Sequence, residues 1–235
     1  MNPALFTAFL RQRAGSPIRL VLAAFLTLPA LAIAIYTESL GPIASSAWYL
    51  AFVFAAGAIG QDVSSGVLQL TFARPVTRPA YVFSRWLAAG TLAVVLANLQ
   101  LFAGAALIAA RGNADAALGA WPMALEYVVR GYTTAALMVM LSTFVGGLGD
   151  LGLYALALFG ASLLGSLAQF KHWTRLAWIA DQLDGTLDAH VSFAWLAGAG
   201  SPRVGDLVTA LSTSALALAI AVAVMNRKEL SYASG

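Results

Sequence analysis

The sequence predicts an all-α integral membrane protein that folds as a single transmembrane domain with six transmembrane helices. Of its 235 residues, 60% are hydrophobic and only 10% are charged, whereas soluble domains average about 25% charged residues. Six intervals without a charged side chain are 18 to 25 residues long, and a helix needs about 20 residues to cross the hydrocarbon core of a membrane. The intervals do not alternate polar and apolar residues as barrel strands do, so helices are the expected spanning elements.

Residues 1–15 are expected to form a helix that lies in the membrane interface. Asn2 can cap this helix, and Pro3 suits its first position. An apolar side followed by two arginines is typical of an interfacial helix, and here it consists of Leu5, Phe6, Phe9, Leu10, Arg11 and Arg13. Because the arginines follow the apolar patch, the segment does not have the order of a signal peptide. The alternative interpretation is a frayed terminus.

The six spans are expected at residues 18–37, 42–61, 80–110, 126–149, 151–170 and 207–226. The fourth and fifth spans are separated only by a very short connection near the sequence GGLGD. Residues 171–206 form a long loop that contains AHVSFAWLAGAGSP. This stretch is too short to span the membrane and too apolar for open water, which indicates a re-entrant or interfacial helix.

The distribution of arginine and lysine favours cytoplasmic termini. With both termini inside, eight of these residues lie on the cytoplasmic side and five lie outside, which is the direction of the positive-inside rule. Seven of the ten acidic residues then lie outside. We therefore expect the connecting segment 63–78 in the cytoplasm and the loop 171–206 on the external side.

The stretch QDVSSGVLQLTFARPVTRPAYVFSRW, from residue 61, is predicted to hold a short helix outside the lipid. Asp62 or Ser64 can cap this helix, which we expect from about Ser65 to Ala73. Its apolar side comes from the run VLQLTF. Pro75 disfavours a helical conformation at the preceding residue and so ends the helix.

A second helix is expected to begin at Thr77, with Pro79 in its first turn, and to continue into the third span. The segment would then be a stiff pair of helices joined by an arginine–proline turn, so that force on the first helix reaches the second. The alternative interpretation is a plain connector whose arginines contact anionic lipid headgroups.

This stretch resembles the cytoplasmic loop of the ABC-2 (type V) permease family, the membrane halves of many ATP-driven exporters. Those proteins typically show an acid, a glycine four residues on, an apolar helix, and then Arg-Pro-x-[Ser/Thr]-Arg before the third span. The matching residues here are Asp62, Gly66, the run Val67–Phe72, Arg74, Pro75, Thr77 and Arg78. The closing sequence MNRKELSYA is also similar to the family's C-terminal ending, whereas Val67 departs from the threonine that commonly follows the glycine.

The resemblance implies a coupling helix that docks on a separate ABC ATP-binding subunit. The residues to which it gives this role are Asp62, Ser65, Gly66, Val67, Leu68, Leu70, Phe72, Arg74, Pro75 and Arg78. It also implies that residues 1–15 are the family's elbow helix and that a second permease copy, in a homodimer, completes the transport unit. The expected location is the bacterial cytoplasmic (inner) membrane.

The chemistry of ATP is expected to belong to the partner. A P-loop needs Gly-x-x-x-x-Gly-Lys-[Ser/Thr], but the two lysines, Lys171 and Lys228, follow Phe170 and Arg227. We therefore expect no enzymatic activity and no catalytic, metal-binding or cofactor-binding residue in this chain, with ATP and Mg on the partner ATPase. The absence of cysteine excludes thiolate metal sites and cysteine nucleophiles, and no dense basic face indicates nucleic acid.

Polar residues elsewhere have two interpretations each. Asn98 and Gln100, in the middle of the third span, line a possible substrate path or make interhelical hydrogen bonds. The acidic group with a nearby histidine binds a divalent cation or, as we favour, is a solvated helix face; its members are Asp181, Asp184, Asp188 and His190. Glu126 and Arg130, four residues apart, are expected to pair.

The function we expect is therefore that of the transmembrane permease subunit of an ATP-driven ABC exporter. One alternative is a six-span secondary carrier or membrane scaffold without an ATPase. Such a carrier usually needs titratable groups near the midplane and internal repeats, and the six intervals show neither. The other alternative is an ABC permease that serves assembly of an extracytoplasmic metalloenzyme or surface structure.

Overall fold

The computed structural model describes residues 3–73, 75–171 and 173–228, and all regular secondary structure in these ranges is helical. This confirms the all-α class. The long helices are α2 (Pro17–Tyr36), α6 (Arg78–Ala110), α7 (Asp115–Phe144), α8 (Gly149–Lys171) and α10 (Val204–Arg227). The shorter elements are α1 (Pro3–Ala14), η1 (Gly41–Ile43), α3 (Ser46–Ala55), α4 (Gly60–Ser64), α5 (Val67–Phe72), α9 (Thr174–Leu187) and η2 (Ala194–Ala197).

Five helical segments in the described part of the chain are long and apolar enough to cross a membrane, as expected of an integral membrane protein. They are α2, the broken segment Gly41–Ser64, α6, α8 and α10. The helix α7, which overlaps the predicted fourth span, is not among the five. Its 30 residues include Asp115, Glu126, Arg130 and three threonines, which lower its mean hydropathy. The count of six spans thus stays a prediction.

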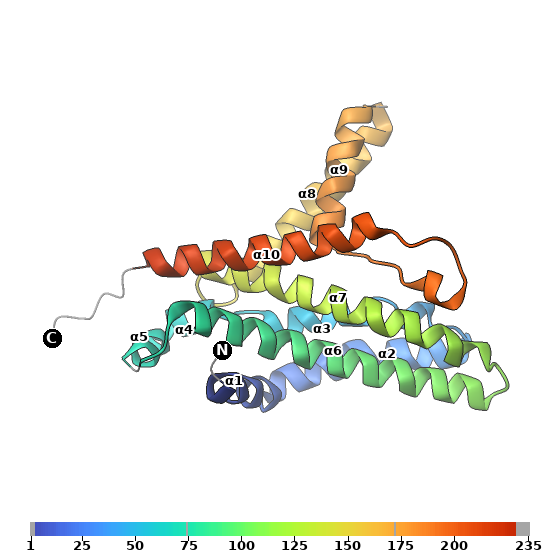
Figure 1. The fold of residues 1–235 in the computed structure, drawn as a ribbon, viewed down its shortest axis with the longest axis horizontal. Helices are drawn as coiled ribbons and strands as arrows, with labels where there is room; N and C mark the ends of the chain where they lie inside the picture. Colours follow the sequence, from blue (N-terminus) through green and yellow to red (C-terminus); the bar gives the residue numbers. More distant parts are fainter. Residues whose placement is uncertain (1–2, 74, 172, 229–235) are drawn as a thin grey trace.

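Figure 1 shows α2, α6, α7 and α10 running along the long axis of the molecule, with α3 beside them. The core lies among α3, α6 and α7, where small residues such as Ala89, Ala93 and Ala97 are buried. Their spacing of four places them on one face of α6, so that the helices approach closely. The helices α8 and α9 leave this bundle together as a steeply inclined pair (Figure 1).

The second apolar segment is not the continuous helix predicted for residues 42–61. Between α3 and α4 the chain forms a turn in which Gly57 has a φ of +62°, a conformation that favours glycine. The helix break exposes backbone groups that need partners inside the protein. Arg13 donates hydrogen bonds to the carbonyls of Phe54 and Ala56 at 2.8 Å and of Gly57 at 3.2 Å.

The backbone amides of the same break donate hydrogen bonds to side chains of α7 and α8. The amide of Gly57 donates to Asp150 Oδ2 at 2.7 Å. The amides of Ile59 and Gly60 both donate to Ser142 Oγ, at 2.9 and 2.7 Å. The break is therefore satisfied from both sides by side chains distant in sequence.

Substitution of Gly60 by alanine should strongly destabilise this junction. A Cβ atom at Gly60 would lie 2.5 Å from the carbonyl oxygen of Val145 and 2.8 Å from that of Gly147. Both contacts are with backbone, so relief requires movement of the α7–α8 connection. We expect a loss of about 1–3 kcal/mol in the free energy of unfolding, the usual cost of overpacking, measured by thermal denaturation in detergent.

Gly146→Ala is the matched control, because its Cβ atom would meet only Ser64 Cβ, at 4.0 Å. That distance is an ordinary van der Waals contact, so we expect little change in stability. Equal melting temperatures for the two variants would contradict the close approach described here.

The helix α7 differs in its bounds from the predicted fourth span, 126–149: it starts earlier and ends earlier. The helix α7 begins at Asp115, which is exposed in its first turn, and it continues through Glu126, whose charge pairs with His190. It ends at Phe144, before Gly147 with its φ of +65°. The predicted spans 18–37, 151–170 and 207–226 agree with α2, α8 and α10 within three residues.

The expected re-entrant or interfacial helix in AHVSFAWLAGAGSP corresponds only to the short 3-10 helix η2, Ala194–Ala197. Most of the helix in the loop 171–206 lies earlier, in α9, which packs against α8. The expected ion pair between Glu126 and Arg130 is wrong. Arg130 instead donates to Asp188 at 2.7 Å, and Glu126 pairs with His190 at 2.7 Å, so both residues of α7 hold the loop rather than each other.

The pair of His190 and Glu126 predicts a pH-dependent loop. The hydrogen bond from His190 to Glu126 raises the pKa of the imidazole above its ordinary value, with Arg130 and Asp188 nearby. A raised pKa means that the pair stabilises the loop fully below the unfolded pKa of about 6.5 and loses this effect as the pH rises through the folded pKa. We expect weaker attachment of residues 188–197 in alkaline solution.

Amide hydrogen exchange of the wild-type chain and of His190→Gln tests this expectation. Comparison at the same pH removes the intrinsic pH dependence of exchange. The wild-type loop should be more protected at about pH 6, and the difference should vanish at about pH 8.5. A difference that is constant with pH would contradict an ionic origin.

Candidate functional site

The short helix predicted from about Ser65 to Ala73 corresponds to α5, at one end of the bundle. We call this end, formed by α5, the start of α6 and the last turn of α10, the α5 end; it lies on the left in Figure 1. The helix is shorter than predicted and begins after Gly66, whose φ is +73°. The predicted caps Asp62 and Ser64 do not act at this position, because α4 and α5 are separate helices.

The helix α5 has one buried side and one exposed side. Leu68 is only 3% exposed and packs in the core, whereas Leu70 is 72% and Val67 42% exposed. Ser65, Gly66 and Pro75 are also exposed, and Phe72 is half-buried. The residues available to a partner are therefore Ser65, Gly66, Val67, Leu70 and Pro75, while Arg74 lies outside the described residues.

Asp62 is buried and points into the protein. Its Oδ2 accepts hydrogen bonds from the hydroxyl of Tyr81 and the guanidinium of Arg85. Arg85 is itself buried, donates to Gln12 Oε1 at 2.9 Å and lies over the ring of Phe9, 3.7 Å from its centroid. Asp62 thus joins α4 to α6 and, through Arg85, to α1, and its role in coupling stays a prediction.

Arg78 also makes intramolecular contacts. Its Nη1 donates to the carbonyls of Met225 and Asn226, both at 2.6 Å, at the end of α10. A cation at this position suits the C-terminal end of a helix, where the last carbonyls lack intrahelical partners. The guanidinium also lies 5.9 Å from the ring centroid of Phe72 in α5. Arg78 therefore connects α5, α6 and α10.

Thr77 begins α6 as predicted. Its hydroxyl accepts a hydrogen bond from the amide of Ala80 at 3.4 Å, and Pro79 lies in the first turn. The helix continues without interruption to Ala110, so the turn after α5 leads directly into a long apolar helix.

Arg13 of α1 has a structural role that sequence reasoning missed, because an arginine in an interfacial helix suggests contact with lipid headgroups. Arg13 is instead 3% exposed. Burial lowers the pKa of its guanidinium to about 9, so it stays charged at neutral pH. The two glycines Gly57 and Gly60 are the only signal in the sequence that an apolar segment breaks there.

Asn98 and Gln100 do not share one environment. Gln100 is buried, and its Nε2 donates to the carbonyl of Thr27 in α2 at 2.8 Å, the interhelical bond of the second interpretation. Asn98 donates to the carbonyl of Val94 in its own helix at 2.9 Å. Neither residue lines the large cavity described next, and a role in a substrate path stays a prediction.

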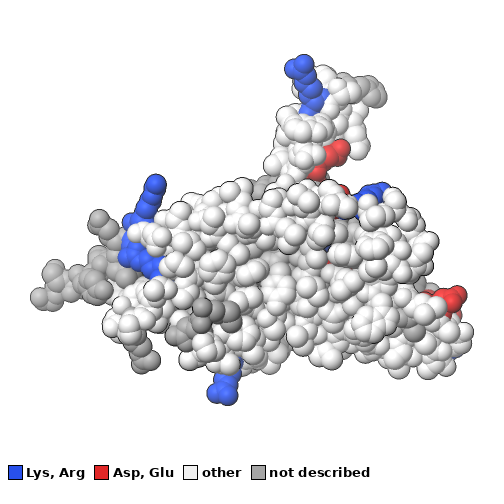
Figure 2. Space-filling view, in the orientation of Figure 1, with Lys and Arg blue, Asp and Glu red and all other residues white. Residues whose placement is uncertain are grey.

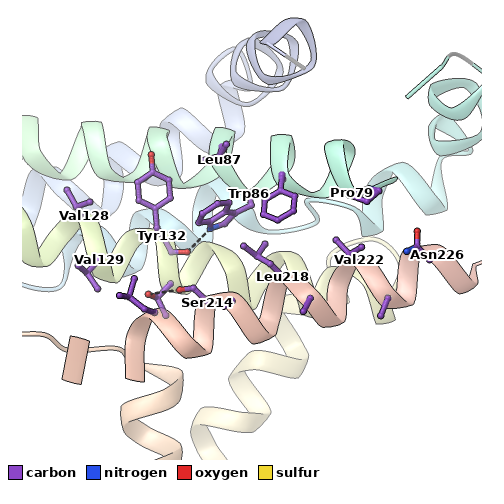
Figure 3. Close-up of a pocket in the computed structure, with 16 residues that line it drawn as sticks. Pro79, Trp86, Leu87, Val128, Val129, Tyr132, Ser214, Leu218, Val222 and Asn226 are labelled. Carbon is purple, nitrogen blue, oxygen red and sulfur yellow. Dashed lines mark hydrogen bonds between the residues drawn. The ribbon is translucent and has the colours of Figure 1, made fainter. Parts of the chain in front are cut away.

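A cavity of about 940 Å³ lies between α6, α7 and α10 (Figure 3). In Figure 3, Trp86 and Tyr132 lie on one side, opposite Leu218 and Val222 of α10. The indole N–H of Trp86 donates to the carbonyl of Tyr132 at 2.9 Å, and the hydroxyl of Ser214 donates to Thr133 at 3.0 Å. The wall combines α6 and α7 with α10, which is distant from them in sequence, so no local pattern in the sequence predicts it.

The described residues contain no group of three or more histidine, aspartate or glutamate side chains that could hold a metal ion. Asp188, of the acidic group considered from the sequence, is engaged by Arg130. Comparison with models of known protein families and with curated proteins found no match. The resemblance to the ABC-2 permeases therefore depends on the residues of the α4–α6 segment and the C-terminal ending.

Proposed function

We propose that this chain is the transmembrane permease subunit of an ATP-driven ABC exporter, with α5 as the helix that docks on a separate ATP-binding subunit. The observation that carries the proposal is that α5 has one buried side and one exposed side. Leu68 holds the helix to the core while Leu70, at 72% exposure, faces outward. An exposed large apolar side chain on a short, firmly attached helix suits a protein partner.

The contacts around α5 suggest how movement of the partner reaches the spans. Phe72 contacts Tyr81 of α6, with ring centroids 5.4 Å apart, and Arg78 joins α6 to the end of α10. Asp62 and Arg85 extend the connection to α1. A push on α5 would move these helices together, as in a rigid-body transition.

The topology we propose keeps six spans, with α7 as the fourth, and both termini in the cytoplasm of a bacterium. A spanning helix inside a bundle can carry polar residues if they face the interior. Arg130, Thr133 and Thr134 are all buried, which supports this placement of α7. The α5 end would then lie on the cytoplasmic side of the inner membrane.

The complex we propose contains two permease copies, ATP and Mg on the partner ATPase, and no cofactor in this chain. Large apolar side chains of α2 and α8 are exposed, among them Phe25 at 73% and Phe159 at 68%. These faces are available for lipid and for contact with the second copy.

Copurification from native membranes in mild detergent tests the proposal. We expect a P-loop ATPase to accompany the tagged chain, and the reconstituted pair to hydrolyse ATP faster than the ATPase alone. Transport of cargo by proteoliposomes that hold this chain alone would instead support a carrier without an ATPase and would contradict the proposal.

Thiol labelling tests the orientation independently. The chain has no cysteine, so Ser65→Cys places a sole thiol at the exposed edge of α5, and Ser201→Cys places one in the exposed loop before α10. A membrane-impermeant maleimide should label only the Ser201→Cys variant in intact cells and both variants in broken cells. The reverse pattern would show that α5 faces outward.

A further inference from the structure

The cavity between α6, α7 and α10 has the dimensions and chemistry of a groove for a hydrocarbon chain. It runs along α10 from Asn226 at the α5 end to Leu211, about 22 Å at 1.5 Å per residue. The hydrocarbon core of one bilayer leaflet is about 15 Å thick, half of the full core. The groove is therefore long enough for an extended acyl chain that enters at the α5 end.

The wall of the groove offers little to a polar ligand. Its lining is mostly apolar, and the polar groups of Trp86, Tyr132, Thr133 and Ser214 are already paired within the protein. Trp86 donates to the Tyr132 carbonyl, the Tyr132 hydroxyl is 2.9 Å from Thr91, and Ser214 donates to Thr133. A hydrocarbon occupant leaves all these hydrogen bonds intact.

The mouth of the groove at the α5 end is basic. Arg78 precedes the lining residue Pro79, and Arg227 and Lys228 follow the lining residue Asn226. None of the three cations forms an ion pair within the part of the chain that the structure describes. Figure 2 shows blue side chains at this end of α10, with red ones on the visible face only toward the other end and on the α8–α9 pair.

We propose that the groove binds one anionic glycerophospholipid of the surrounding bilayer, with an acyl chain along α10 and the phosphate at Arg78, Arg227 and Lys228. Basic pockets at the ends of transmembrane helices attract anionic headgroups through charge. Burial lowers the pKa of the Lys228 amine, and a phosphate beside it would favour its charged form. The site requires only that the α5 end lies at a membrane surface and does not depend on an ATPase partner.

A helix of a second copy is a poorer occupant on grounds of size. A helix about 10 Å across and 22 Å long fills roughly 1,700 Å³, nearly twice the volume of the cavity. A neutral hydrophobic molecule would fit the wall but would bring no anion to the three cations, of which Arg78 is hydrogen-bonded only to the neutral carbonyls of Met225 and Asn226. Charge complementarity thus favours the anionic lipid.

The test uses the full chain in nanodiscs made from equal amounts of phosphatidylglycerol and phosphatidylcholine, followed by native mass spectrometry. The wild-type chain should retain phosphatidylglycerol in preference to phosphatidylcholine. Ala219→Trp fills the groove from an exposed alanine of its wall and should abolish retention. Leu216→Trp, on the lipid-facing side of the same helix and 63% exposed, is the matched control and should retain the lipid.

The double variant Arg227→Gln, Lys228→Gln changes the mouth without touching the packed wall. We expect its preference for phosphatidylglycerol to fall about fivefold per charge removed, while acyl-chain binding persists. Equal retention of both lipids by the wild-type chain would overturn the proposal, as would unchanged retention by Ala219→Trp. A dimer that dissociates in Ala219→Trp without loss of lipid would assign the groove to a second copy instead.

Discussion

Replacement of Asp62 by alanine is expected to lower the free energy of unfolding by about 3–5 kcal/mol, because it leaves a buried guanidinium without its counter-ion. Asp62 is 5% and Arg85 3% exposed. Tyr81 also loses the acceptor of its hydroxyl. The measurement is the denaturation midpoint of the purified chain in detergent. If the proposed coupling is correct, stimulated ATPase activity should also fall, since α4 loses its attachment to α6.

The double variant Asp62→Leu, Arg85→Met is the control for this prediction. Replacement of both members of a buried ion pair by apolar residues of similar size is often nearly neutral. We expect the double variant to regain most of the stability that Asp62→Ala loses. A double variant as unstable as the single one would show that the two residues do not act as a pair.

Replacement of Leu70 by glutamate is expected to abolish binding of the ATP-binding subunit while the chain itself stays folded. The side chain is 72% exposed, so its loss should change the stability of the isolated chain by no more than about 0.5 kcal/mol. At the centre of an interface, a buried charge in place of an apolar anchor costs about 2–4 kcal/mol, roughly thirtyfold to a thousandfold in affinity. Copurification and ATPase stimulation measure the effect.

Leu68→Ala should show the opposite behaviour. Leu68 is 3% exposed and packs in the core, so truncation should lower stability by about 2–5 kcal/mol. The ATPase should still bind the part of this variant that remains folded. Normal ATPase binding by Leu70→Glu would refute the assignment of α5 as the docking helix.

Much of the helical layout could be predicted because uncharged intervals mark helices that face lipid. The boundaries of α2, α8 and α10 agree with the predicted spans within three residues, and Thr77 begins α6 as expected. These features depend on local properties: hydrophobic length, a capping hydroxyl and a proline in the first turn.

Long-range contacts account for what the sequence did not reveal. The second apolar segment breaks at Gly57, and Arg13, more than forty residues earlier in the chain, donates hydrogen bonds to the carbonyls of the break. Arg130 pairs with Asp188 rather than with its helical neighbour Glu126. In each case the local sequence pattern predicted one partner for the arginine, and the folded chain supplies another that is distant in sequence.

The candidate site also has features that the local sequence predicted and features that depend on long-range contacts. The apolar pattern of VLQLTF predicted a helix with an apolar side, and the structure shows which leucine is exposed. The inward direction of Asp62 was not predictable, because its partner Arg85 lies in the next helix. The groove proposed to bind lipid was not predictable either, because it exists only once α6, α7 and α10 are side by side.

The broken segment has a mechanical consequence. In some transporters an unwound stretch leaves backbone carbonyls free to coordinate a cation. Here the carbonyls of Phe54, Ala56 and Gly57 already accept hydrogen bonds from the guanidinium of Arg13. Bending of the chain between α3 and α4 would break these hydrogen bonds and also those that the backbone amides donate to Ser142 and Asp150. We therefore expect the break to act as a rigid joint that links α3 and α4 to α1 through Arg13 and to the start of α8 through Asp150.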